Sequence, residues 1–351
     1  MKSFTTVAVA GALALTSIVS AQGPPPPPPL TPCASVTGLQ LVCGQQAPED
    51  LIVLPGGQWV VAGAYAGSGG VHIIGARDRK SVVAYPSASA GKRLDARTYP
   101  ACPGPPDAAA GARFTTHGLY LQPGANAVHK LFVVGHGSRE SVEVFEVDAR
   151  SGTPAFTWIG CVIAPDPIGL NSVRAFPDGG FIATNFRARD SSPADRDRMM
   201  AGERNGELWE WHTASGWQKV PGSEASGANG IEISDDGRWY YVAAWGSQSF
   251  FRLSRGQATP RRDEIPLGFR VDNIHWVPGG KLLAGGQGAQ GTEIVEIDPA
   301  AMTVRPVARR ADDDSFRAGT VAAPVGDQLW VGSFLGDRIA VLPAPPGGSA
   351  R

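Results

Sequence analysis

The sequence has 351 residues with 31 Lys and Arg against 32 Asp and Glu, which gives a formal net charge of −1 at pH 7. The two signs are interspersed rather than clustered, which excludes the basic footprint of a nucleic-acid-binding protein, and no second apolar run is long enough to cross a membrane. The 45 glycines and 30 prolines favour an all-β fold of short strands and many turns.

Residues 1–21 are predicted to be a signal peptide. Lys2 supplies a positive charge, the apolar core "VAVAGALALTSIV" follows, and the small residues "VSA" precede Gln22. This apolar stretch is too short to span a bilayer, so we expect export to the periplasm or the exterior, with cleavage near Ala21. Residues 22–32 contain "GPPPPPP" and are predicted to be an extended proline-rich linker.

Four cysteines, Cys33, Cys43, Cys102 and Cys161, form an even set. In an exported chain such a set allows two disulfides, in any of three pairings. We prefer Cys33–Cys43 with Cys102–Cys161. Their spacing is poor for a metal site.

One pattern occurs six times after the linker. A strand, a turn of Gly, Asp or Pro, and a second strand rich in Val, Trp, Tyr and Ala are found at 49–63, 117–135, 171–185, 229–244, 272–286 and 319–333. Further strand candidates such as "SVEVFEVD" and "TEIVEID" follow most copies. Six repeats of four short strands are typical of a six-bladed β-propeller, which we predict for residues 33–342, followed by a flexible tail at 343–351.

The first strand of each propeller blade lines the central tunnel, and polar residues recur where these strands begin. Four of them lie eight residues before a turn glycine: Glu49, Asn171, Asn229 and Asp272. His117 takes the same place in the second repeat, and Asn273 lies beside Asp272, whereas the sixth repeat offers only Ala318 and Gly319. We therefore expect a ring of polar side chains at one mouth of the tunnel.

The ring residues other than His117 offer only oxygen atoms as ligands. Two carboxylates with several amide oxygens suit a hard cation, and the size of a propeller mouth favours Ca²⁺ over Mg²⁺. The alternative is that these side chains only cap the inner strands by hydrogen bonding to backbone groups. That alternative would leave Glu49 and Asp272 close together without a positive partner.

Two histidines are predicted to meet beside this ring. His117 opens the first strand of its repeat and His136 closes the second, so an antiparallel return brings both to the same end. Neighbouring strands are about 4.8 Å apart, so the two imidazoles should lie within reach of each other. Such a pair supplies a base that activates water; the alternative is two rim histidines without a chemical role. The other four are expected to be structural or exposed: His72, His129, His212 and His275.

The upper ends of the other second strands are predicted to form a pocket wall for a small, partly apolar molecule. They carry Tyr65, Asn185, Trp245, Gln287 and Phe334. After Asn185 comes an insertion in which Ser192, Pro193 and Asp195 predict a short helix. This helix is either part of a lid over the mouth or a solvated excursion.

Several segments together resemble the paraoxonase/arylesterase family and, more distantly, the senescence marker protein and gluconolactonase group. They are "PEDLIVLPGG", "THGLYL", "LNSVRAFPDGGFIATN", "ANGIEISDDGRWYYVA" and "VDNIHW", spread over about residues 47–340. The resemblance implies a six-bladed propeller whose Ca²⁺ polarises the carbonyl oxygen of a lactone or ester.

The resemblance also implies roles for individual residues. The catalytic Ca²⁺ would be held by Glu49, Asn171, Asn229, Asp272 and Asn273. The family's histidine dyad would fall on His117 and His136, and Asp272 competes for the role of base. A second, structural Ca²⁺ would use Asp50, Leu119 and Ser172, but serine replaces an acid there and makes that ion doubtful. The family's disulfide to the last blade has no counterpart, so ring closure must rely on strand pairing or on Cys33 and Cys43.

The sequence therefore predicts an exported, calcium-dependent hydrolase of lactones or of aryl and carboxylic esters, with a small-molecule substrate and no nucleic-acid partner. One alternative is a non-catalytic propeller that binds a ligand or a protein and uses Ca²⁺ only to lock its blades. Another is a synthase-like condensation on the same fold, against which the complete set of oxygen ligands argues. The chain has no G-x-S-x-G, P-loop or H-E-x-x-H motif.

Overall fold

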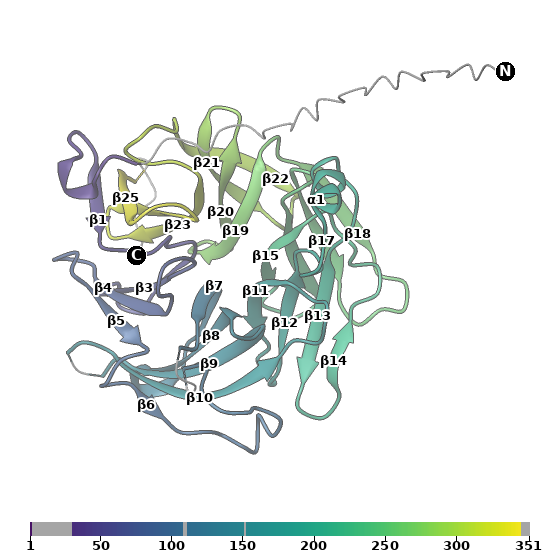
Figure 1. Ribbon diagram of the computed structural model, residues 1–351, viewed down its shortest axis with the longest axis horizontal. Coiled ribbons are helices and arrows are strands. Elements are labelled where there is room, and N and C mark those ends of the chain that lie inside the picture. The colour runs from purple at the N-terminus through teal and green to yellow at the C-terminus, as the bar shows by residue number, and fades with distance from the viewer. Residues whose placement is uncertain (2–29, 108–110, 151, 345–351) are drawn as a thin grey trace.

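The computed structural model describes residues 1, 30–107, 111–150 and 152–344. The predicted signal peptide after Met1, the linker up to residue 29 and the tail from residue 345 lie outside the described residues. The described chain forms six antiparallel sheets arranged around a central axis (Figure 1). This is the six-bladed β-propeller that the repeats predict.

The blades follow one another along the chain. In each, the strands run outward from the axis in chain order, except that the outermost strand of blades two and six comes from an earlier part of the chain. Blade one contains β2 (Leu51–Val53), β3 (Trp59–Gly63), β4 (Val71–Gly75) and β5 (Ser81–Tyr85). Blade two contains β7 (Phe114–Gln122), β8 (Val128–Gly137), β9 (Ser141–Asp148) and β10 (Ala155–Ile163), with β6 (Gly91–Lys92) added parallel to β10. Blade three contains β11 (Leu170–Ala175), β12 (Phe181–Asn185), β13 (Glu207–His212) and β14 (Gly216–Lys219).

The remaining blades repeat the arrangement. Blade four contains β15 (Ala228–Ile233), β16 (Trp239–Ala244), β17 (Ser249–Ser254) and β18 (Arg262–Pro266), and blade five contains β19 (Arg270–Val277), β20 (Lys281–Gly288), β21 (Gly291–Asp298) and β22 (Thr303–Arg310). Blade six contains β23 (Gly319–Val325), β24 (Gln328–Ser333), β25 (Arg338–Pro343) and β1 (Gln40–Cys43). Two 3-10 turns are η1 (Cys33–Ser35) and η2 (Ala125–Ala127).

Strand pairing between the two ends of the chain closes the ring. β1 lies antiparallel to β25, with Gln40 opposite Val341 and Cys43 opposite Arg338. The Cys33–Cys43 disulfide fastens the preceding segment to β1, and Cys102–Cys161 joins the loop before β7 to β10. Both predicted disulfides are therefore confirmed, and closure uses an N-terminal strand in place of a disulfide to the last blade.

Burial decreases from the axis outward. β12 and β15 are buried along their whole length, whereas most residues of the outer strand β22 are exposed. Large aromatic side chains such as Phe145, Trp158 and Trp330 fill the space around the sheets and are almost completely buried. Because both faces of an inner strand are covered by neighbouring blades, the sequence there reads as an apolar run rather than as an alternation.

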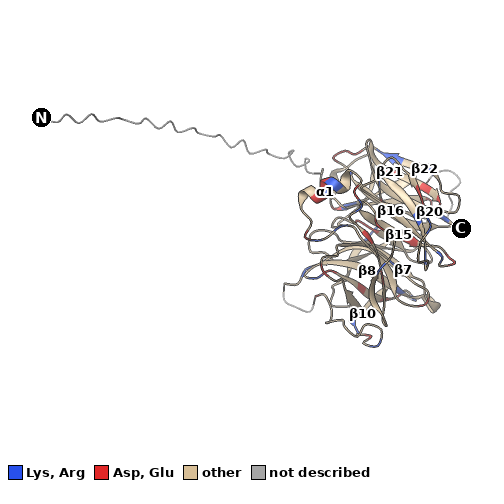
Figure 2. Ribbon diagram, turned by 90° about the vertical axis from the view of Figure 1, so that its right-hand side faces the viewer, with Lys and Arg blue, Asp and Glu red and all other residues tan. Residues whose placement is uncertain are grey.

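The one α-helix among the described residues is α1 (Pro193–Met200), in the predicted insertion after β12. Ser192 caps it: its side chain accepts from the Asp195 backbone N–H, and the Asp195 carboxylate accepts from the Ser192 N–H. The helix lies on one face of the propeller, where acidic and basic residues alternate along it (Figure 2). No helix in the described part of the chain is long and apolar enough to cross a membrane.

Candidate metal centre and active site

A β-bulge interrupts the innermost strand pair in five blades, at equivalent positions. The residues left out of the pairing include His117, Asn171, Asn229, Asp272 and Thr320. A bulge leaves its extra residue unpaired and turns the side chain out of the normal alternation. In blade one, Glu49 takes the corresponding place just before β2. The repeated bulge therefore explains how side chains from separate blades converge at one end of the tunnel.

The residue after two of these side chains must be glycine because neighbouring inner strands approach closely. A Cβ on Gly118 would lie 2.5 Å from the carbonyl oxygen of Asn171, and one on Gly230 would lie 2.6 Å from that of Asp272. We expect Gly230→Ala to destabilise the fold by about 1–3 kcal/mol, as overpacking does, and to weaken metal binding because it displaces Asp272.

The matched control is Gly237→Ala in the exposed turn of the same blade. Gly237 has φ +69° and its Cβ would meet only the tip of Arg255, 4.0 Å away. Alanine there should cost about 1 kcal/mol through backbone strain and leave metal affinity unchanged. Thermal unfolding and calcium titration of both variants test this; equal calcium affinities would contradict it.

Five buried side chains form what we call the oxygen ring: Glu49, Asn171, Asn229, Asp272 and Asn273. All are at most 4% exposed. Four of them hold an oxygen without any hydrogen-bond partner among the described residues: Glu49 Oε2, Asn171 Oδ1, Asn229 Oδ1 and Asn273 Oδ1. A buried polar atom without a partner costs free energy. Several such oxygens in one ring are the expected signature of a bound cation.

The amide orientations agree with this interpretation. Asn273 donates from Nδ2 to Glu49 Oε1 at 2.7 Å, and the Nδ2 of Asn171 lies 3.3 Å from His117 Nε2. The amide nitrogens of Asn273 and Asn171 are thus used by neighbours, while their amide oxygens are left free. Thr320 Oγ1 donates to the Glu49 carbonyl at 2.6 Å and holds the backbone of that residue in place.

Two carboxylates of the ring are buried close together. Burial, and then the charges of Asp272 and Asp50, raise the pKa of Glu49 well above its ordinary value. Burial also raises the pKa of Asp272 to about 7, although Gln287 donates to its Oδ2 at 2.8 Å. Buried carboxylates of like charge need a positive partner to remain ionised.

The oxygen ring therefore fits a hard divalent cation such as Ca²⁺. Within the described residues, no group of three or more His, Cys, Asp and Glu side chains is arranged to hold a metal. That finding agrees with the ring's composition, because three of its five members are carboxamides. The structure brings together the five side chains expected from the sequence as ligands, and their binding of a metal stays a prediction.

The residues expected for a second Ca²⁺ do not fit a cation. Asp50 Oδ1 accepts from the Leu51 N–H at 2.8 Å and from His275 Nε2 at 2.7 Å, and its Oδ2 accepts from the Leu119 N–H at 2.7 Å. Burial lowers the pKa of His275, but Asp50 and Glu232 outweigh burial and raise it to about 10. An imidazolium thus already neutralises Asp50. His275, expected to have only a structural or exposed place, lies inside the tunnel.

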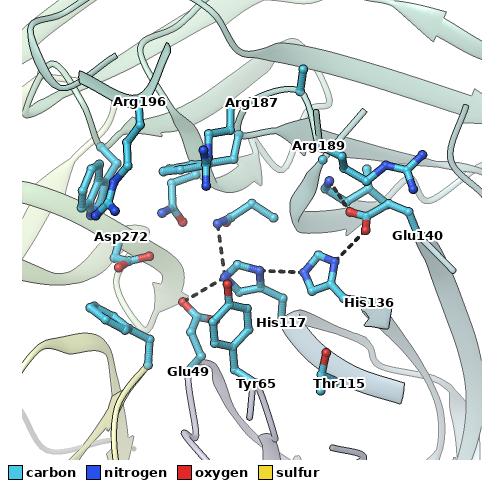
Figure 3. Close-up of a pocket in the computed structure, with 18 of the residues that line it drawn as sticks. Glu49, Tyr65, Thr115, His117, His136, Glu140, Arg187, Arg189, Arg196 and Asp272 are labelled. Carbon is cyan, nitrogen blue, oxygen red and sulfur yellow. Dashed lines mark hydrogen bonds and ion pairs between the residues drawn. The ribbon is translucent and has the colours of Figure 1, made fainter. Parts of the chain in front are cut away.

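Beside the ring, three side chains form what we call the histidine relay: His117, His136 and Glu140 (Figure 3). His117 Nδ1 lies 3.0 Å from His136 Nε2, and His136 Nδ1 lies 2.9 Å from Glu140 Oε2. Glu140 Oε1 accepts from the Leu170 N–H at 2.6 Å, which fixes the carboxylate. The two imidazoles meet as expected, although β7 begins three residues before His117 and His136 is paired with Thr115.

Glu140 sets the direction of the hydrogen bonds in the histidine relay. A carboxylate only accepts hydrogen bonds, so His136 donates from Nδ1 and its Nε2 accepts from His117 Nδ1–H. This leaves the lone pair on His117 Nε2, which accepts from Asn171 Nδ2 at 3.3 Å and lies 3.7 Å from Glu49 Oε1. Burial, and then His136, lower the pKa of His117 well below its ordinary value. A neutral imidazole therefore presents its basic nitrogen to the oxygen ring.

Glu140 was not among the residues found from the sequence. It follows His136 by four positions in "HGSRE", across the turn between β8 and β9. An acid near a catalytic histidine is a common arrangement, so its proximity was the available signal. The turn geometry that aims it back at His136 could not be read from the residues.

A cavity of about 660 Å³ opens above the ring and the relay. Its lining residues include Glu49, Asn171, Asn229, Asp272, His117, His136 and Glu140. Tyr65 covers the relay, with its ring centroid 4.5 Å from that of His117. Arg196 and Met199 of α1 also line the cavity, so the helix forms part of its wall.

Three of the five residues expected in the pocket wall line this cavity: Tyr65, Trp245 and Phe334. Asn185 and Gln287 instead hold lining residues in place. Asn185 Oδ1 accepts from the Gly169 N–H at 2.9 Å, while Gln287 joins Trp245 Nε1 to Asp272, each at 2.8 Å.

Comparison with known proteins gives a likeness in structure only. No family model matches the sequence, and no curated protein matches it. Among solved structures, a luciferin-regenerating enzyme has 14% identity, a TM-score of 0.56 and coverage of 90% of this chain and 98% of its own. A gluconolactonase from Xanthomonas campestris has 15% identity, a TM-score of 0.54 and coverage of 91% and 95%.

A third structure, described as the calcium-binding protein regucalcin from Agrobacterium tumefaciens, has 12% identity, a TM-score of 0.51 and coverage of 88% and 94%. These likenesses establish a shared fold over nearly the whole of each chain. The narrower resemblance to the paraoxonase/arylesterase family stays a prediction.

Proposed function

We propose that the protein is a calcium-dependent hydrolase of lactones or of aryl and carboxylic esters. The observation that carries the proposal is the set of buried, unpaired oxygens in the oxygen ring, located at the floor of a cavity beside the histidine relay. A cation site alone would suit a structural role. A cation site next to a neutral, buried imidazole, both facing a cavity, is the arrangement that hydrolysis needs.

Each residue of the site has a separate role in the proposed hydrolysis. Bound Ca²⁺ would supply a Lewis acid that polarises the substrate carbonyl and stabilises developing negative charge. His117 Nε2 accepts a proton from water as the water attacks the carbonyl carbon. His136 and Glu140 hold that imidazole in the required tautomer and stabilise its positive charge. Asp272 is the competing base. Each candidate atom already accepts one hydrogen bond, His117 Nε2 from Asn171 and Asp272 Oδ2 from Gln287.

Two further points support this proposal. The structures of similar fold include a gluconolactonase and a protein described as calcium-binding. Two disulfides agree with an exported protein, because such bonds persist in oxidising compartments. We therefore also propose that residues 1–21 direct export and that the propeller begins near Cys33.

Calcium removal is the direct test. We expect a chelator to abolish hydrolysis of a panel of lactones and aryl esters, and added Ca²⁺ but not Mg²⁺ to restore it. Because a ligand that binds only the folded state stabilises it, calcium at 100 times its Kd should add about 2.7 kcal/mol to the free energy of unfolding. Metal content, initial rates and thermal unfolding are measured on the same samples.

Undiminished hydrolysis in a sample shown to be free of metal would contradict the proposal. Calcium-dependent stability with no turnover of any substrate in the panel would favour the alternative, a non-catalytic propeller that binds a ligand.

A further inference from the structure

Arginine side chains line the outer part of the cavity. Arg187 and Arg189 follow β12, Arg196 lies on α1, and Arg113 precedes β7. Figure 3 shows Arg187 and Arg196 across the cavity from Glu49 and Tyr65. The cavity thus has an acidic floor and a basic rim.

Three of these arginines, Arg113, Arg187 and Arg196, lack a carboxylate partner among the described residues. Arg189 forms an ion pair with Asp166. Arg187, in contrast, donates only to the Ser191 hydroxyl, at 3.0 Å. Arg196 makes no side-chain hydrogen bond or ion pair with any described residue, although other arginines of the same segment do. We call Arg187 and Arg196 the rim arginines.

A further guanidinium, that of Arg270, lies behind the cavity wall and also has no carboxylate partner among the described residues. Arg270 stacks over Trp245, with its guanidinium carbon 4.4 Å from the ring centroid. Its Nη1 is buried without a hydrogen-bond partner among the described residues. This positive charge adds to that of the rim arginines.

Positive charges that converge on a cavity without counter-ions attract a ligand that carries negative charge. A guanidinium matches the planar, paired oxygens of a carboxylate or phosphate. Phe186, Met199, Trp245 and Phe334 line the space between floor and rim, and they suit a short apolar linker. The shape therefore favours a molecule with a reactive carbonyl at one end and an anionic group at the other.

We propose that the rim arginines select lactones or esters that carry a second, anionic oxygen group, a carboxylate or a phosphate. This inference rests on the proposed hydrolase function, because it names the substrate class of the same cavity. It assigns the insertion between β12 and β13 a role in specificity.

The test compares matched substrates on matched variants. An aryl ester with a free terminal carboxylate, its neutral terminal amide, and the analogue with a terminal phosphate are hydrolysed by wild type, Arg187→Gln, Arg196→Gln and the double variant. The control is Arg198→Gln on the same helix, since Arg198 pairs with Asp195 and Glu203 and does not line the cavity.

Wild type should prefer an anionic ester to the neutral amide in kcat/KM. Each single variant should reduce this preference about tenfold, as loss of one charged hydrogen bond does, and the double variant about a hundredfold. Rates on the neutral ester and all rates of the control should change less than about twofold. The carboxylate and phosphate arms identify which anion is preferred. Equal wild-type rates on anionic and neutral esters, or an undiminished preference in the double variant, would overturn the inference.

A binding measurement separates this inference from the hydrolase proposal. Glutarate and its neutral diamide are titrated calorimetrically into the calcium-loaded protein. Weaker glutarate binding in the double variant, with the control unchanged, would support an anion site even if no ester is hydrolysed. Glutarate binding no tighter than diamide binding, or equal in wild type and double variant, would overturn the anion site whatever the rates.

Discussion

Replacing Asp272 by asparagine is expected to abolish calcium binding at micromolar concentrations and to slow hydrolysis about a thousandfold, because several kcal/mol of electrostatic stabilisation are lost. Asparagine keeps the shape of the side chain and its hydrogen bond from Gln287. The change therefore removes charge and little else. Calorimetric calcium titration and initial rates measure the two effects.

The same variant should behave differently without metal. In the calcium-free protein Asp272 repels Glu49 across a buried site, so the neutral variant should unfold at a higher temperature than the calcium-free wild type. With calcium the order should reverse. A reversal of this kind distinguishes the loss of a calcium ligand from general damage to the fold. General damage would lower the unfolding temperature of the variant both with and without calcium.

Asp298→Asn is the matched control. Asp298 ends β21 in the same blade and forms an ion pair with Lys281 near the surface. We expect little change in calcium affinity or rate. If Asp272→Asn kept the calcium affinity of wild type, the oxygen ring would not be the metal site.

Replacing His117 by glutamine is expected to lower kcat by about 10²–10⁴-fold, the usual contribution of a general base, while calcium binding is retained. Glutamine cannot accept a proton from water at neutral pH. Glu140→Gln should have a smaller effect, about 10–100-fold, because it leaves the base in place and weakens only its orientation. Single-turnover rates and metal content are the measurements.

The control for the relay is His212→Gln, since His212 is partly exposed on β13 and does not line the cavity. Its rate should match wild type. Unchanged kcat in His117→Gln with calcium bound would assign the base to Asp272. Unchanged kcat in Glu140→Gln alone would mean that His136 needs no carboxylate.

The sequence predicts most of this architecture because its repeats are visible at the level of residue type. Four of the six copies keep a turn glycine and a polar residue eight positions earlier, which is enough to align Glu49, Asn171, Asn229 and Asp272 across blades that are far apart in the chain. The α1 helix also follows from a local pattern, since cap residues act over short distances. The disulfide pairing, in contrast, is a preference among three possible pairings, and Cys102 and Cys161 are 59 residues apart.

What the sequence could not predict depends on how strands sit relative to one another. The β-bulges that place the ring side chains outside the normal alternation depend on the register between neighbouring strands. Residue types alone do not show that register. The contact between Asp50 and His275 joins blades one and five, so no local spacing indicates it. Asn185 and Gln287 do not line the cavity and instead form hydrogen bonds with residues that do.

Pairing of β1 with β25 has a consequence for the order of assembly. β1 is synthesised long before β23, β24 and β25, so it cannot pair within blade six until the end of the chain has been synthesised. Until then β1 keeps an open edge that could pair wrongly with another molecule. If the proposed calcium site is correct, we expect calcium to bind only after β1 has closed blade six, because the oxygen ring draws its side chains from separate blades.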